Sequence, residues 1–331
     1  MKAEILRLLK ESDEYISGQQ LCEQFQVSRT AVWKVIDQLK KEGYKIEAVR
    51  NKGYRLVDCL ENLDILTQAE IESQMNTKWA GKNVIYYDEI DSTNTRAKDL
   101  GDKGDKKNNG TLFVADRQVA GKGRRGRAWE SPSGSSISMT ILLHPDILPN
   151  KASELTLIMA LAVEEGVEKV TGLKPGIKWP NDIVLSGKKI CGILTEMSTE
   201  ISYINYVIIG VGINVNMESF PDEIRDVATS LKIESGSEVK RASLIAAIME
   251  SFEKFYEIFL ETQDLSGVVD HYNSLLLNKN QKVRVLEPGH EYEAMALGIS
   301  SSGELIVRLE DGEEREVYAG EVSVRGVYGY V

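Results

Sequence analysis

The stretch GKGRRGR at residues 121–127 is the most informative of this chain, because it puts three glycines and four positive charges into seven residues. Its three glycines match the pattern G-x-G-x-x-G, which in a dinucleotide-binding fold opens a helix whose N-terminus receives a pyrophosphate. The next residues, AWESPSGSS at 128–136, cannot continue a helix, and an apolar, strand-like run from Ile137 to Leu143 follows. The stretch therefore predicts a flexible cationic loop that can wrap a carboxylate or phosphates, and it argues against a doubly wound dinucleotide-binding sheet.

Strands and helices alternate on both sides of this loop, as is typical of a mixed α/β domain. Short apolar runs predict strands at 84–87, 111–115, 183–185, 189–194 and 206–213. Longer amphipathic runs predict helices at 65–73, 154–170, 241–261 and 265–277. The strand at 111–115 leads directly to Gln118 and the cationic loop, and a short connection at 58–62 precedes the domain.

The first sixty residues carry the signals of a winged helix-turn-helix. Hydrophobic periodicity predicts three helices, at 2–10, 21–25 and 29–42. Ser17 and Ser28 stand where the second and third helices need N-caps, and only three residues separate those two helices. The segments 44–49 and 53–57 flank a basic tip, which predicts the β-hairpin of a wing.

The third predicted helix presents a polar face that suits the major groove of DNA. Its apolar residues fall in one stripe, so the residues between them point outward. Helix, turn and basic wing coincide where a groove reader needs them, although a winged helix that mediates protein contacts remains the alternative. The candidate DNA-binding residues are Ser28, Arg29, Thr30, Trp33, Lys34, Arg50 and Lys52.

From Gln281 the pattern changes to short strands separated by turn signals such as Pro288-Gly289. The strands are predicted at 283–286, 292–299, 304–309, 314–318 and 322–327. Five such strands indicate a small β-barrel of the SH3-like type. Residues 278–331 hold 6 Lys+Arg against 10 Asp+Glu, so nucleic acid is not expected to bind this part.

The overall composition excludes several classes of protein. The net charge of −11 argues against nonspecific coating of nucleic acid, yet residues 1–62 hold 11 Lys+Arg against 10 Asp+Glu and can still present a positive face. Three separated cysteines and three histidines offer neither a disulfide framework nor metal-ligand spacing. We expect no signal peptide and no membrane span, and therefore a cytoplasmic protein.

Two polar clusters and one tryptophan of the α/β domain are candidates for chemistry. Ser92-Thr93-Asn94 stands at a strand-to-helix junction, where it can hold the polar head of a ligand or where Ser92 can simply cap the helix. Trp129 ends the cationic loop and belongs either to the core or to a ligand site. The motif KWPND at 178–182 combines a cation, an amide and a carboxylate, and the following hairpin returns Lys189 beside it unless Lys189 is a solvated lysine.

Other nucleotide and hydrolase motifs are missing from the sequence. The Gly-Lys pairs at 81–82, 121–122 and 187–188 lack the Ser or Thr of a Walker P-loop, so ATP would be held in another way. No Gly-x-Ser-x-Gly motif indicates a serine hydrolase.

Taken together, STN at 92–94, Gln118 with the loop at 121–127, KWPND at 178–182 and GIN at 212–214 resemble the motif set of biotin protein ligases. The N-terminal winged helix makes the chain similar to the bifunctional biotin ligase/repressors of bacteria, and the resemblance covers essentially the whole chain. Lys122 stands where many members have Arg, which keeps the charge but loses a bidentate fork and leaves its role open.

The resemblance implies a multidomain α+β chain. A winged helix-turn-helix DNA-binding domain would span residues 1–62. A central mixed α/β catalytic domain of the biotin/lipoate ligase type would span residues 63–277, and an SH3-like β-barrel would span residues 278–331.

The resemblance also implies two half-reactions and their residues. Biotin and Mg·ATP would give biotinyl-5′-AMP and pyrophosphate, and the biotinyl group would then pass to a lysine of the biotin carboxyl carrier protein of acetyl-CoA carboxylase. The catalytic residues would be Lys189, Arg124 and Asp182, with Asp182 as the candidate Mg²⁺ ligand. The biotin-binding residues would be Ser92, Thr93, Asn94, Gln118, Lys122, Gly123, Arg124, Trp129 and Lys189. The adenylate- and ATP-binding residues would be Arg124, Arg125, Arg127, Trp129, Lys178, Asn181 and Asn214.

Two roles remain open for Asn181 and Asp182, since either can meet Mg²⁺ or orient the incoming amine, and a purely structural role is the alternative. The loop at 121–127 is predicted to be disordered without ligand, and the stretch 214–231 is predicted to order over the adenylate. By the same resemblance the adenylate would act as corepressor, promoting a homodimer that binds operator DNA.

Two other functions stay in consideration. A lipoate ligase shares the general catalytic architecture, but neither the arginine loop nor the winged helix would be expected in it. A purely ligand-responsive transcription factor would need no chemistry at Lys189 or Asp182.

Overall fold

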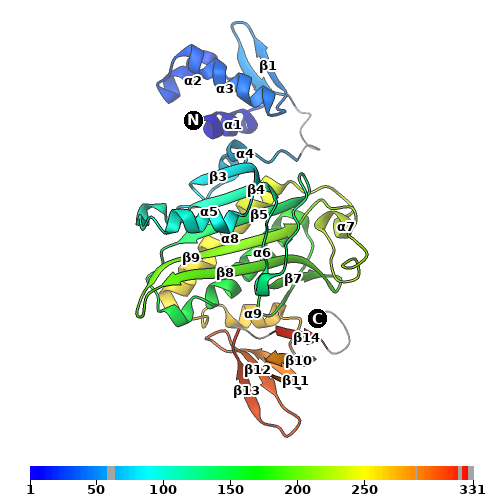
Figure 1. Cartoon of the computed structure of the whole chain (residues 1–331). Coiled ribbons are helices and arrows are strands. Elements are labelled where there is room, and N and C mark those ends of the chain that lie inside the picture. Colours follow the sequence, from blue (N-terminus) through cyan, green and yellow to red (C-terminus); the bar gives the residue numbers. More distant parts are fainter. Residues whose placement is uncertain (58–63, 288, 320–322, 327–331) are drawn as a thin grey trace.

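Residues 1–57 fold into three helices and a hairpin (Figure 1). In this computed structural model the described residues are 1–57, 64–287, 289–319 and 323–326. The predicted connection at 58–62, and with it the boundary between the first two domains, lies outside the described residues. So do Pro288 and both ends of the last predicted strand, residues 322 and 327.

The winged helix-turn-helix forms where the capping signals place it. Its helices and strands are α1 (Lys2–Glu11), α2 (Gly18–Phe25), α3 (Arg29–Lys41), β1 (Ile46–Val49) and β2 (Gly53–Leu56). The Ser17 hydroxyl accepts a hydrogen bond from the Gln20 amide, and the Ser28 hydroxyl accepts one from the Ala31 amide. Each cap satisfies a backbone donor that the first turn of a helix leaves unpaired, so both predicted starts are confirmed within three residues.

A short helix, α4 (Gln68–Gln74), belongs to the hydrophobic cores of two units at once. Ala69 is buried among residues of the winged helix, whereas Ile71 and Met75 are buried in the core of the central domain. Arg7 of α1 donates hydrogen bonds to the carbonyl oxygens of Glu72, Ser73 and Met75 at the end of α4. The winged helix is therefore packed directly against the central domain through α4.

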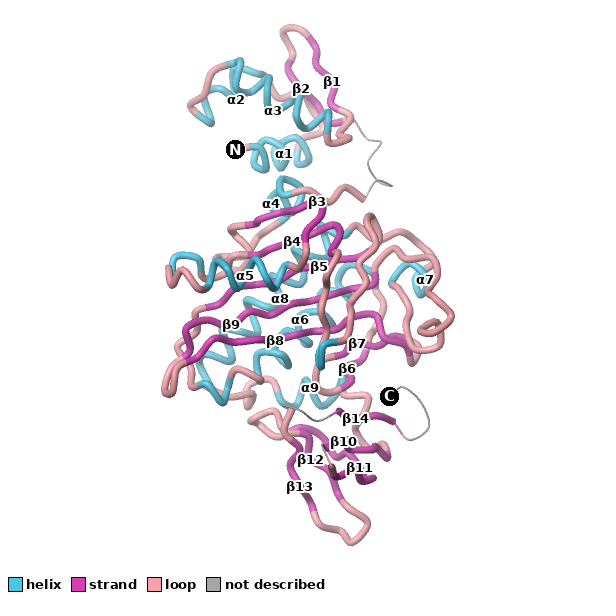
Figure 2. Tube along the Cα trace, viewed as in Figure 1, coloured by secondary structure: helices cyan, strands magenta, loops and turns pink. Residues whose placement is uncertain are grey.

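A seven-stranded mixed sheet forms the centre of the molecule, in the order β3-β4-β5-β9-β8-β7-β6 (Figure 2). Only β3 and β4 are parallel, and all the other pairs are antiparallel. Its strands are β3 (Val84–Ile90), β4 (Leu112–Gln118), β5 (Ser136–Leu143), β6 (Gly176–Lys178), β7 (Asp182–Leu185), β8 (Lys188–Thr199) and β9 (Ile204–Asn214). The sheet thus has the mixed α/β character that the sequence predicts.

Helices cover the two faces of this sheet unequally (Figures 1 and 2). The long helices α6 (Glu154–Thr171) and α8 (Arg241–Thr262) pack on one face, and α5 (Thr93–Gly101) covers part of the other. Because strand side chains alternate, Val207 and Ile209 enter the larger core while Ile208 packs beneath α5. Further along the same strand, the positions on the α5 side are Gly210 and Gly212, and here the face of the sheet is open.

The C-terminal part is a five-stranded antiparallel sheet in the order β13-β12-β11-β10-β14. Its strands are β10 (Lys282–Glu287), β11 (His290–Ile299), β12 (Leu305–Arg308), β13 (Glu314–Val317) and β14 (Ser323–Gly326). The predicted count of five short strands is confirmed, and each contains the core of a predicted one. The sheet joins the central domain through α9 (Val269–Leu275). The short helix α7 (Leu231–Ser235) lies next to the end of β9, where its Lys232 amide donates to the Val215 carbonyl.

Two predicted helices are longer in the sequence pattern than in the structure. The linking helix begins at Gln68 and not at 65, because the Thr67 hydroxyl caps it by accepting from the Glu70 amide. The helix expected at 265–277 spans only Val269–Leu275, because the Leu265 amide donates to the Ser301 carbonyl of the C-terminal sheet. A local cap therefore shortens the first helix, and a tertiary contact shortens the second.

Candidate active site

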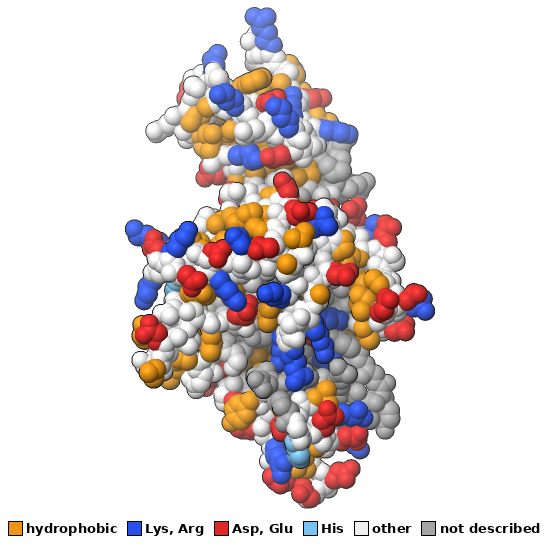
Figure 3. Space-filling model, in the orientation of Figure 1, with side chains coloured by type: hydrophobic (Ala, Val, Ile, Leu, Met, Phe, Trp, Pro, Cys, Tyr) orange, Lys and Arg blue, Asp and Glu red, His pale blue; other side chains and the backbone are white. Residues whose placement is uncertain are grey.

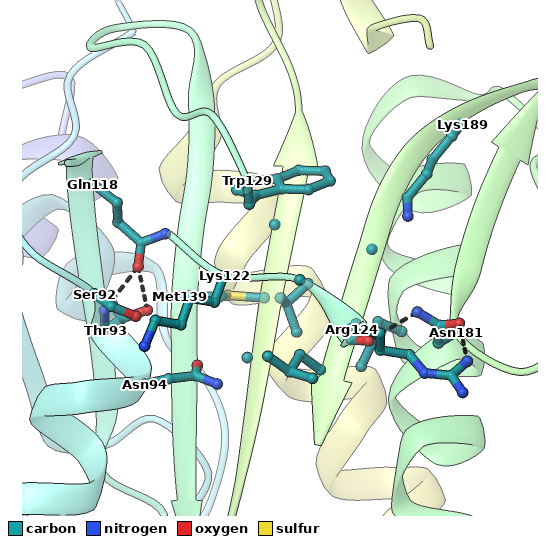
Figure 4. Close-up of a pocket in the computed structure, with 17 residues that line it drawn as sticks. Ser92, Thr93, Asn94, Gln118, Lys122, Arg124, Trp129, Met139, Asn181 and Lys189 are labelled. Carbon is teal, nitrogen blue, oxygen red and sulfur yellow. Dashed lines mark hydrogen bonds between the residues drawn. The ribbon is translucent and has the colours of Figure 1, made fainter. Parts of the chain in front are cut away.

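The open face of the central sheet contains a pocket of about 460 Å³ beside α5 (Figure 4). Polar residues of the β3–α5 turn lie on one side of it, and Arg124 with Asn181 lies on the other. Its lining residues are Ser92, Thr93, Asn94, Gln118, Lys122, Gly123, Arg124, Trp129, Met139, Asn181, Lys189, Gly192, Ile193, Leu194, Gly210, Val211 and Gly212. The pocket thus brings together all nine residues that the resemblance assigned to biotin.

The turn between β3 and α5 supplies the polar end of the pocket. The backbone amide and the hydroxyl of Thr93 both donate to Gln118 Oε1, at 2.7 and 3.0 Å, and so link this turn to the end of β4. Ser92 occupies the N-cap position of α5, but its side chain makes no capping hydrogen bond. The alternative that Ser92 merely caps the helix is therefore wrong, and its hydroxyl lines the pocket.

Asn94 is held in place by two residues that the sequence analysis missed. Its amide nitrogen donates to Glu196 Oε2 at 2.8 Å, and its Oδ1 accepts from the Thr140 hydroxyl at 2.7 Å. Glu196 also accepts from Lys98 at 2.7 Å, so its charge is paired. Because donor and acceptor are both fixed, the amide of Asn94 can present only one orientation to a ligand. No motif in the sequence pointed to Glu196 or Thr140, which reach Asn94 from two other strands.

Three glycines form the floor of the pocket by leaving room for larger side chains. A Cβ atom on Gly212 would lie 2.3 Å from the ring of Trp129, and one on Gly210 would lie 2.2 Å from Asn94 Oδ1. A Cβ on Gly192 would lie 3.0 Å from Lys189 Nζ. The alternation of glycine in the apolar run VIIGVGIN at 207–214 is the signal that could have identified this floor, since glycine within a strand marks close approach.

The cationic loop folds back over the pocket as a tight turn. A bridge pairs Lys122 with Ala128, and the Gly123 amide donates to the Arg127 carbonyl at 2.7 Å. Arg125 and Gly126 adopt left-handed backbone conformations at the tip, with φ of 58° and 71°. No helix follows the loop, so the prediction that it is not a dinucleotide-binding turn is confirmed. Whether it is disordered without ligand stays a prediction.

Arg124 is the residue of this loop that reaches into the molecule. Its guanidinium donates to Asn181 Oδ1 at 2.9 Å and to the Ala319 carbonyl at 2.8 Å, so it connects the loop with two other segments. Burial lowers the pKa of Arg124, and neighbouring Arg125 lowers it further, while Asp182 acts in the opposite direction. A guanidinium nevertheless stays charged in proteins, so Arg124 brings a fixed positive charge to the pocket.

Lys189 points inward from the start of β8, and its neighbour does not. The Lys189 ammonium lies 2.5 Å from Asp182 Oδ1 and 5.7 Å from the centre of the Trp129 ring. The Lys188 ammonium donates instead to the Arg225 carbonyl at 2.8 Å, on the segment that precedes α7. Lys189 therefore faces the pocket, and the alternative of Lys189 as a solvated hairpin lysine is wrong.

The KWPND motif divides between the pocket and the protein interior. Asn181 lines the pocket and also donates to the Ile193 carbonyl at 3.1 Å. Trp179 is 1% exposed, and its indole N–H donates to the Gly303 carbonyl at 3.0 Å. Lys178 is buried, and the structure does not bring it into the lining of the pocket. Its place in the adenylate site therefore depends on the resemblance alone.

Three further residues expected at the adenylate lie apart from the pocket lining. Asn214 is buried at the end of β9, where its amide donates to the Thr229 carbonyl at 3.1 Å. Arg127 is exposed, and Arg125 lines a larger hollow of about 1140 Å³ on the far side of Arg124. That hollow shares Arg124, Asn181, Ile193 and Leu194 with the pocket, so the two cavities are neighbours.

The segment before α7 approaches the pocket from behind Lys189. The backbone of Lys189 donates to the Val227 carbonyl at 2.8 Å and accepts from the Thr229 amide at 2.9 Å. This part of the predicted stretch 214–231 is therefore attached to β8 at the residue that carries the central ammonium group.

The candidate DNA-binding residues are all exposed, on α3 and its N-cap and on the tip of the hairpin. Trp33 is 57% exposed on α3, and Thr30 and Lys34 beside it are exposed as well. Ser28 caps the same helix, and the Arg29 guanidinium is fixed by Gln19 at 3.0 Å. Arg50 and Lys52 are exposed on the tip between β1 and β2, and basic side chains stand out on this unit in Figure 3.

Neither a metal cluster nor a membrane helix is found in the part of the chain that the structure describes. Within 1–57, 64–287, 289–319 and 323–326, no group of three or more His, Cys, Asp or Glu residues could hold a metal ion. No helix among the same residues is both long and apolar enough to span a bilayer. Asp182, the candidate Mg²⁺ ligand, is paired with Lys189.

Family models match all three units of the chain. The model described as the biotin/lipoate A/B protein ligase family matches residues 86–214, and an HTH domain model matches residues 2–55. The biotin protein ligase C-terminal domain model matches residues 280–325. Each match falls on one of the units that the fold separates.

Similar proteins are found in both sequence and structure. The chain is 40% identical over 327 residues to the bifunctional ligase/repressor BirA of Bacillus spizizenii (strain ATCC 23059 / NRRL B-14472 / W23), with 98% of each chain covered. It is 29% identical over 218 residues to the biotin–[acetyl-CoA-carboxylase] ligase of Mycobacterium tuberculosis (strain ATCC 25618 / H37Rv), covering 64% of this chain and 78% of that one. A solved biotin protein ligase from Aquifex aeolicus, in complex with biotin and ATP, superposes with a TM-score of 0.66 and 32% identity, covering 74% of this chain and 99% of that one.

Proposed function

This chain belongs to the family of bifunctional biotin ligase/repressors, and on that premise we propose how its own residues carry out the two activities. It is a biotin protein ligase that uses ATP, and it is a transcriptional repressor. The observation that carries the site assignment is the pocket that joins Ser92, Thr93, Asn94 and Gln118 to Arg124 and Lys189. We place the domains at residues 1–62, 63–277 and 278–331.

The ureido head of biotin would bind at the end of the pocket formed by the β3–α5 turn. A ureido group offers one carbonyl acceptor and two N–H donors, so it needs both donors and acceptors around it. Ser92, Thr93, Asn94 and Gln118 provide hydroxyls and amides there, and the orientation of Asn94 is fixed by Glu196 and Thr140. The ring of Trp129, which lies on Gly212, would cover the apolar part of biotin or the adenine.

Positive groups would bring the carboxylate of biotin and the phosphates of ATP together. In the first step a carboxylate oxygen attacks the α-phosphorus, and the bond to the oxygen that bridges to the β-phosphorus breaks, so pyrophosphate leaves. The two reactants repel each other, and negative charge builds up around the α-phosphorus. Lys189 and Arg124 lie where they can contact both groups, and Lys122, Arg125 and Arg127 add positive charge along the loop.

Mg²⁺ would enter with ATP, since this ion binds through one or two carboxylates together with substrate phosphates. Asp182 would meet the ion once Lys189 turns to the substrates, and Asn181 would remain beside it. When bound, Mg²⁺ would neutralise phosphate charge. Asp182 and Asn181 can equally orient the incoming amine in the second step.

In the second half-reaction the lysine amine of the carrier protein attacks the acyl carbon of biotinyl-5′-AMP. An amide bond forms, the bond between the acyl carbon and the phosphate oxygen breaks, and AMP leaves while the amine loses a proton. The partner would be the biotin carboxyl carrier protein of acetyl-CoA carboxylase, as the name of the mycobacterial relative indicates. Such a partner and an operator would both be met in the cytoplasm.

The adenylate would also act as corepressor by promoting a homodimer. Two winged helices related by a two-fold axis fit a palindromic operator, and the exposed residues of α3 and the wing would contact it. Among the residues that the structure describes, the half of β8 beyond Ile193 has no partner strand on the side of β7, so the central domain offers a strand edge for association.

The ligase activity is tested by biotin-dependent exchange between ATP and pyrophosphate. We expect exchange with biotin and none with lipoate; exchange with lipoate alone would make the chain a lipoate ligase, and exchange with neither would leave only a regulator. The dimer is tested by sedimentation, in which biotin plus ATP should shift the protein from monomer to dimer. An unchanged mass at micromolar protein would reject the ligand-promoted dimer.

A further inference from the structure

A buried arginine at the start of α8 joins three segments that are far apart in the sequence. Arg241 is 3% exposed, and its Nε lies 2.5 Å from Asp64 Oδ2 while its Nη1 lies 2.6 Å from Asp116 Oδ1. Its backbone amide donates to Asp64 Oδ1 at 2.9 Å, and Nη1 also donates to the Ser136 carbonyl at 3.1 Å. One guanidinium therefore holds two carboxylates and one backbone carbonyl, and both carboxylates are largely shielded from water.

Asp116 connects Arg241 to the segment that follows the cationic loop. It is on β4, two residues before Gln118, and it accepts a hydrogen bond from the Gly134 amide at 3.1 Å and another from the Ser133 hydroxyl. Burial alone would raise the pKa of Asp116, but hydrogen bonds from Ser133 and Arg241 outweigh it and lower the pKa. Asp116 therefore stays charged and keeps the segment after the loop, at Ser133 and Gly134, attached to Arg241.

Asp64 connects Arg241 to the segment that follows β9. It accepts from the Asn216 side chain at 3.1 Å, and Asn216 also exchanges two hydrogen bonds of 2.9 Å with the backbone of Val239. The Ser135 carbonyl accepts from the amides of Val215 and Asn216, at 3.1 and 2.7 Å, so the two loop segments meet each other here as well. Asn216 begins the chain that runs on to Val227 and the backbone of Lys189.

From Asp64 the chain continues directly into α4, the helix shared by the winged helix and the central domain. Glu70 of α4 is 8% exposed; its carboxylate is 2.5 Å from the Lys10 ammonium and accepts from the Tyr44 hydroxyl. The N-cap of α4, Thr67, lies three residues after Asp64, and Asp116, two residues before Gln118 of the pocket lining, is joined to Asp64 through Arg241. Asp64 thus lies between the DNA-binding unit and two segments beside the pocket, residues 131–135 and 216–230, which we call the ligand segments.

The energetics of buried charge make this cluster act as one unit. A buried ion pair is expensive to break, because removal of either partner leaves an uncompensated charge away from water. The loop segment at Ser133–Gly134 and the segment at Asn216 cannot move independently of Arg241 without leaving Asp116 or Asp64 short of donors. A movement of either ligand segment therefore changes the hydrogen bonds and the position of Asp64.

We propose that Arg241 is a positioning residue that couples the two ligand segments of the ligase pocket to the α4 helix, and through it to the DNA-binding unit. Arg241 contacts neither expected ligand and acts through Asp116 on one side and through Asp64 on the other. This inference rests on the proposed function, because it assumes that the pocket binds biotin and ATP. The effect of ligand binding would thus reach α4 through a cluster of side chains that lies outside the pocket.

The experiment is amide hydrogen exchange on the full chain, with and without biotin plus Mg·ATP, for the wild type and Asp64→Asn. An amide can accept through one atom only, so the Asn side chain must turn an NH₂ group toward Arg241 Nε or toward its backbone amide. Glu72→Gln is the matched control, because it makes the same carboxylate-to-amide change on α4 without contact to Arg241. We expect ligand to slow exchange at 131–135, at 216–230 and at 64–75 in the wild type and the control. In Asp64→Asn the slowing at 64–75 should be lost while the other two segments keep it.

Slowing at the two loop segments with none at 64–75 in the wild type would overturn the coupling and leave the ligand site intact. The same holds if Asp64→Asn keeps the full response at 64–75. Absence of slowing at every segment would overturn the proposed function together with this inference. Ser133→Ala serves as a second variant, because it removes one hydrogen bond to Asp116 at an exposed position and leaves both ion pairs of Arg241 in place. It should reduce the response at 64–75.

Operator binding gives an independent measure of the same coupling. Biotin plus ATP should tighten binding of the wild type and of Glu72→Gln to operator DNA by a factor within the usual range for allosteric coupling, roughly 5- to 150-fold. The factor should be smaller in Asp64→Asn, because only the contribution of the ligand-promoted homodimer would remain. An equal factor in all three proteins would overturn the inference.

Discussion

The winged helix and the ligand pocket differ in how their working residues are supported. On α3 the exposed residues Thr30, Trp33 and Lys34 lie on one continuous helix, and the buried apolar residues of the opposite face stabilise the fold. In the pocket, Asn94, Arg124 and Lys189 come from three separate segments, and glycines of two strands leave room for them. Folding and function are separable on the helix, whereas in the pocket the same contacts serve both. Substitutions should therefore have different effects in the two regions.

The largest expected effect comes from the charge at the centre of the pocket. Lys189→Met should lower the rate of biotin-dependent ATP–pyrophosphate exchange by about 10²- to 10³-fold, the usual loss for one preorganised group that stabilises a transition state. Lys188→Met is the matched control, since the Lys188 ammonium contacts the Arg225 carbonyl and not the pocket. Equal losses in the two variants would show that Lys189 has no special role.

The next effect concerns retention of the intermediate. Arg124→Gly removes the hydrogen bonds to Asn181 and to the Ala319 carbonyl, so the loop loses its anchor over the pocket. Hydrogen bonds to charged groups are worth about 1.5 to 3 kcal/mol, which corresponds to roughly 10- to 150-fold faster escape of biotinyl-5′-AMP. The escape is measured as biotin attached to lysines of a bystander protein. Wild-type levels of such labelling would show that the loop does not close over the adenylate.

A single methyl group in the floor of the pocket should have a comparable or smaller effect. Gly212→Ala would place a Cβ atom 2.3 Å from the Trp129 ring, which must then move. Overpacking of this kind costs about 1 to 3 kcal/mol and should weaken biotin binding by roughly 5- to 150-fold in a titration calorimeter. Gly18→Ala in the winged helix, where the nearest atom to the added Cβ is 3.6 Å away, should leave biotin affinity unchanged.

On the winged helix the corresponding change should be mild and selective. Lys34→Ala removes one exposed positive charge from α3, so operator binding should weaken at low salt and the slope of log affinity against log salt should fall by about one. Its rate of ATP–pyrophosphate exchange should equal that of the wild type. A loss of exchange activity would show that function and folding are no more separable on α3 than in the pocket.

The smallest effect lies in the interior of the central domain. Burial raises the pKa of Glu154 to about 7, with smaller contributions from Lys151 in the lowering direction and from Asp264 and Glu304 in the raising direction. A carboxyl group whose folded-state pKa exceeds its unfolded value loses stabilisation as the pH rises from about 4.5 to about 7. Glu154→Gln should therefore match the wild type at pH 5 and exceed its free energy of unfolding at pH 8, by on the order of 1 kcal/mol.

Denaturant unfolding at the two pH values measures this difference. Burial also raises the pKa of Glu164 to about 7, but Glu164 is present in both proteins, so the comparison isolates residue 154. A variant that is less stable than the wild type at pH 8 would show that the Glu154 carboxylate is stabilised by contacts that outweigh its burial.

The two regions also differ in how much of each the sequence could predict. The caps at Ser17 and Ser28 act on residues three positions away, so local patterns place α2 and α3 within three residues. The pocket residues were found because short motifs mark them, but their supports were not. Glu196 and Thr140 carry no motif, since they matter only because the sheet brings β8 and β5 beside Asn94.

The same dependence on strand pairing explains why some residues that a motif assigned to the site lie apart from the pocket lining. Lys178 belongs to the KWPND motif, yet it is buried at the end of β6 and lies outside the pocket lining, while Asn181 of the same motif lines the pocket. Similarly, Asn214 ends a glycine-containing strand but bonds to the Thr229 carbonyl. Sequence spacing identifies such motifs, but the direction of each side chain depends on strand pairing.

The shared helix α4 makes the two activities difficult to inherit separately. A gene that lost the codons for the winged helix would leave Ala69 exposed on α4 and Glu70 without Lys10 and Tyr44. Such a shortened chain would need polar residues on that face of α4, because the exposed apolar face would otherwise cause aggregation at high concentration. Anyone who excises the ligase as a labelling tool meets the same requirement, and the cut would best be combined with a redesigned surface on this one helix.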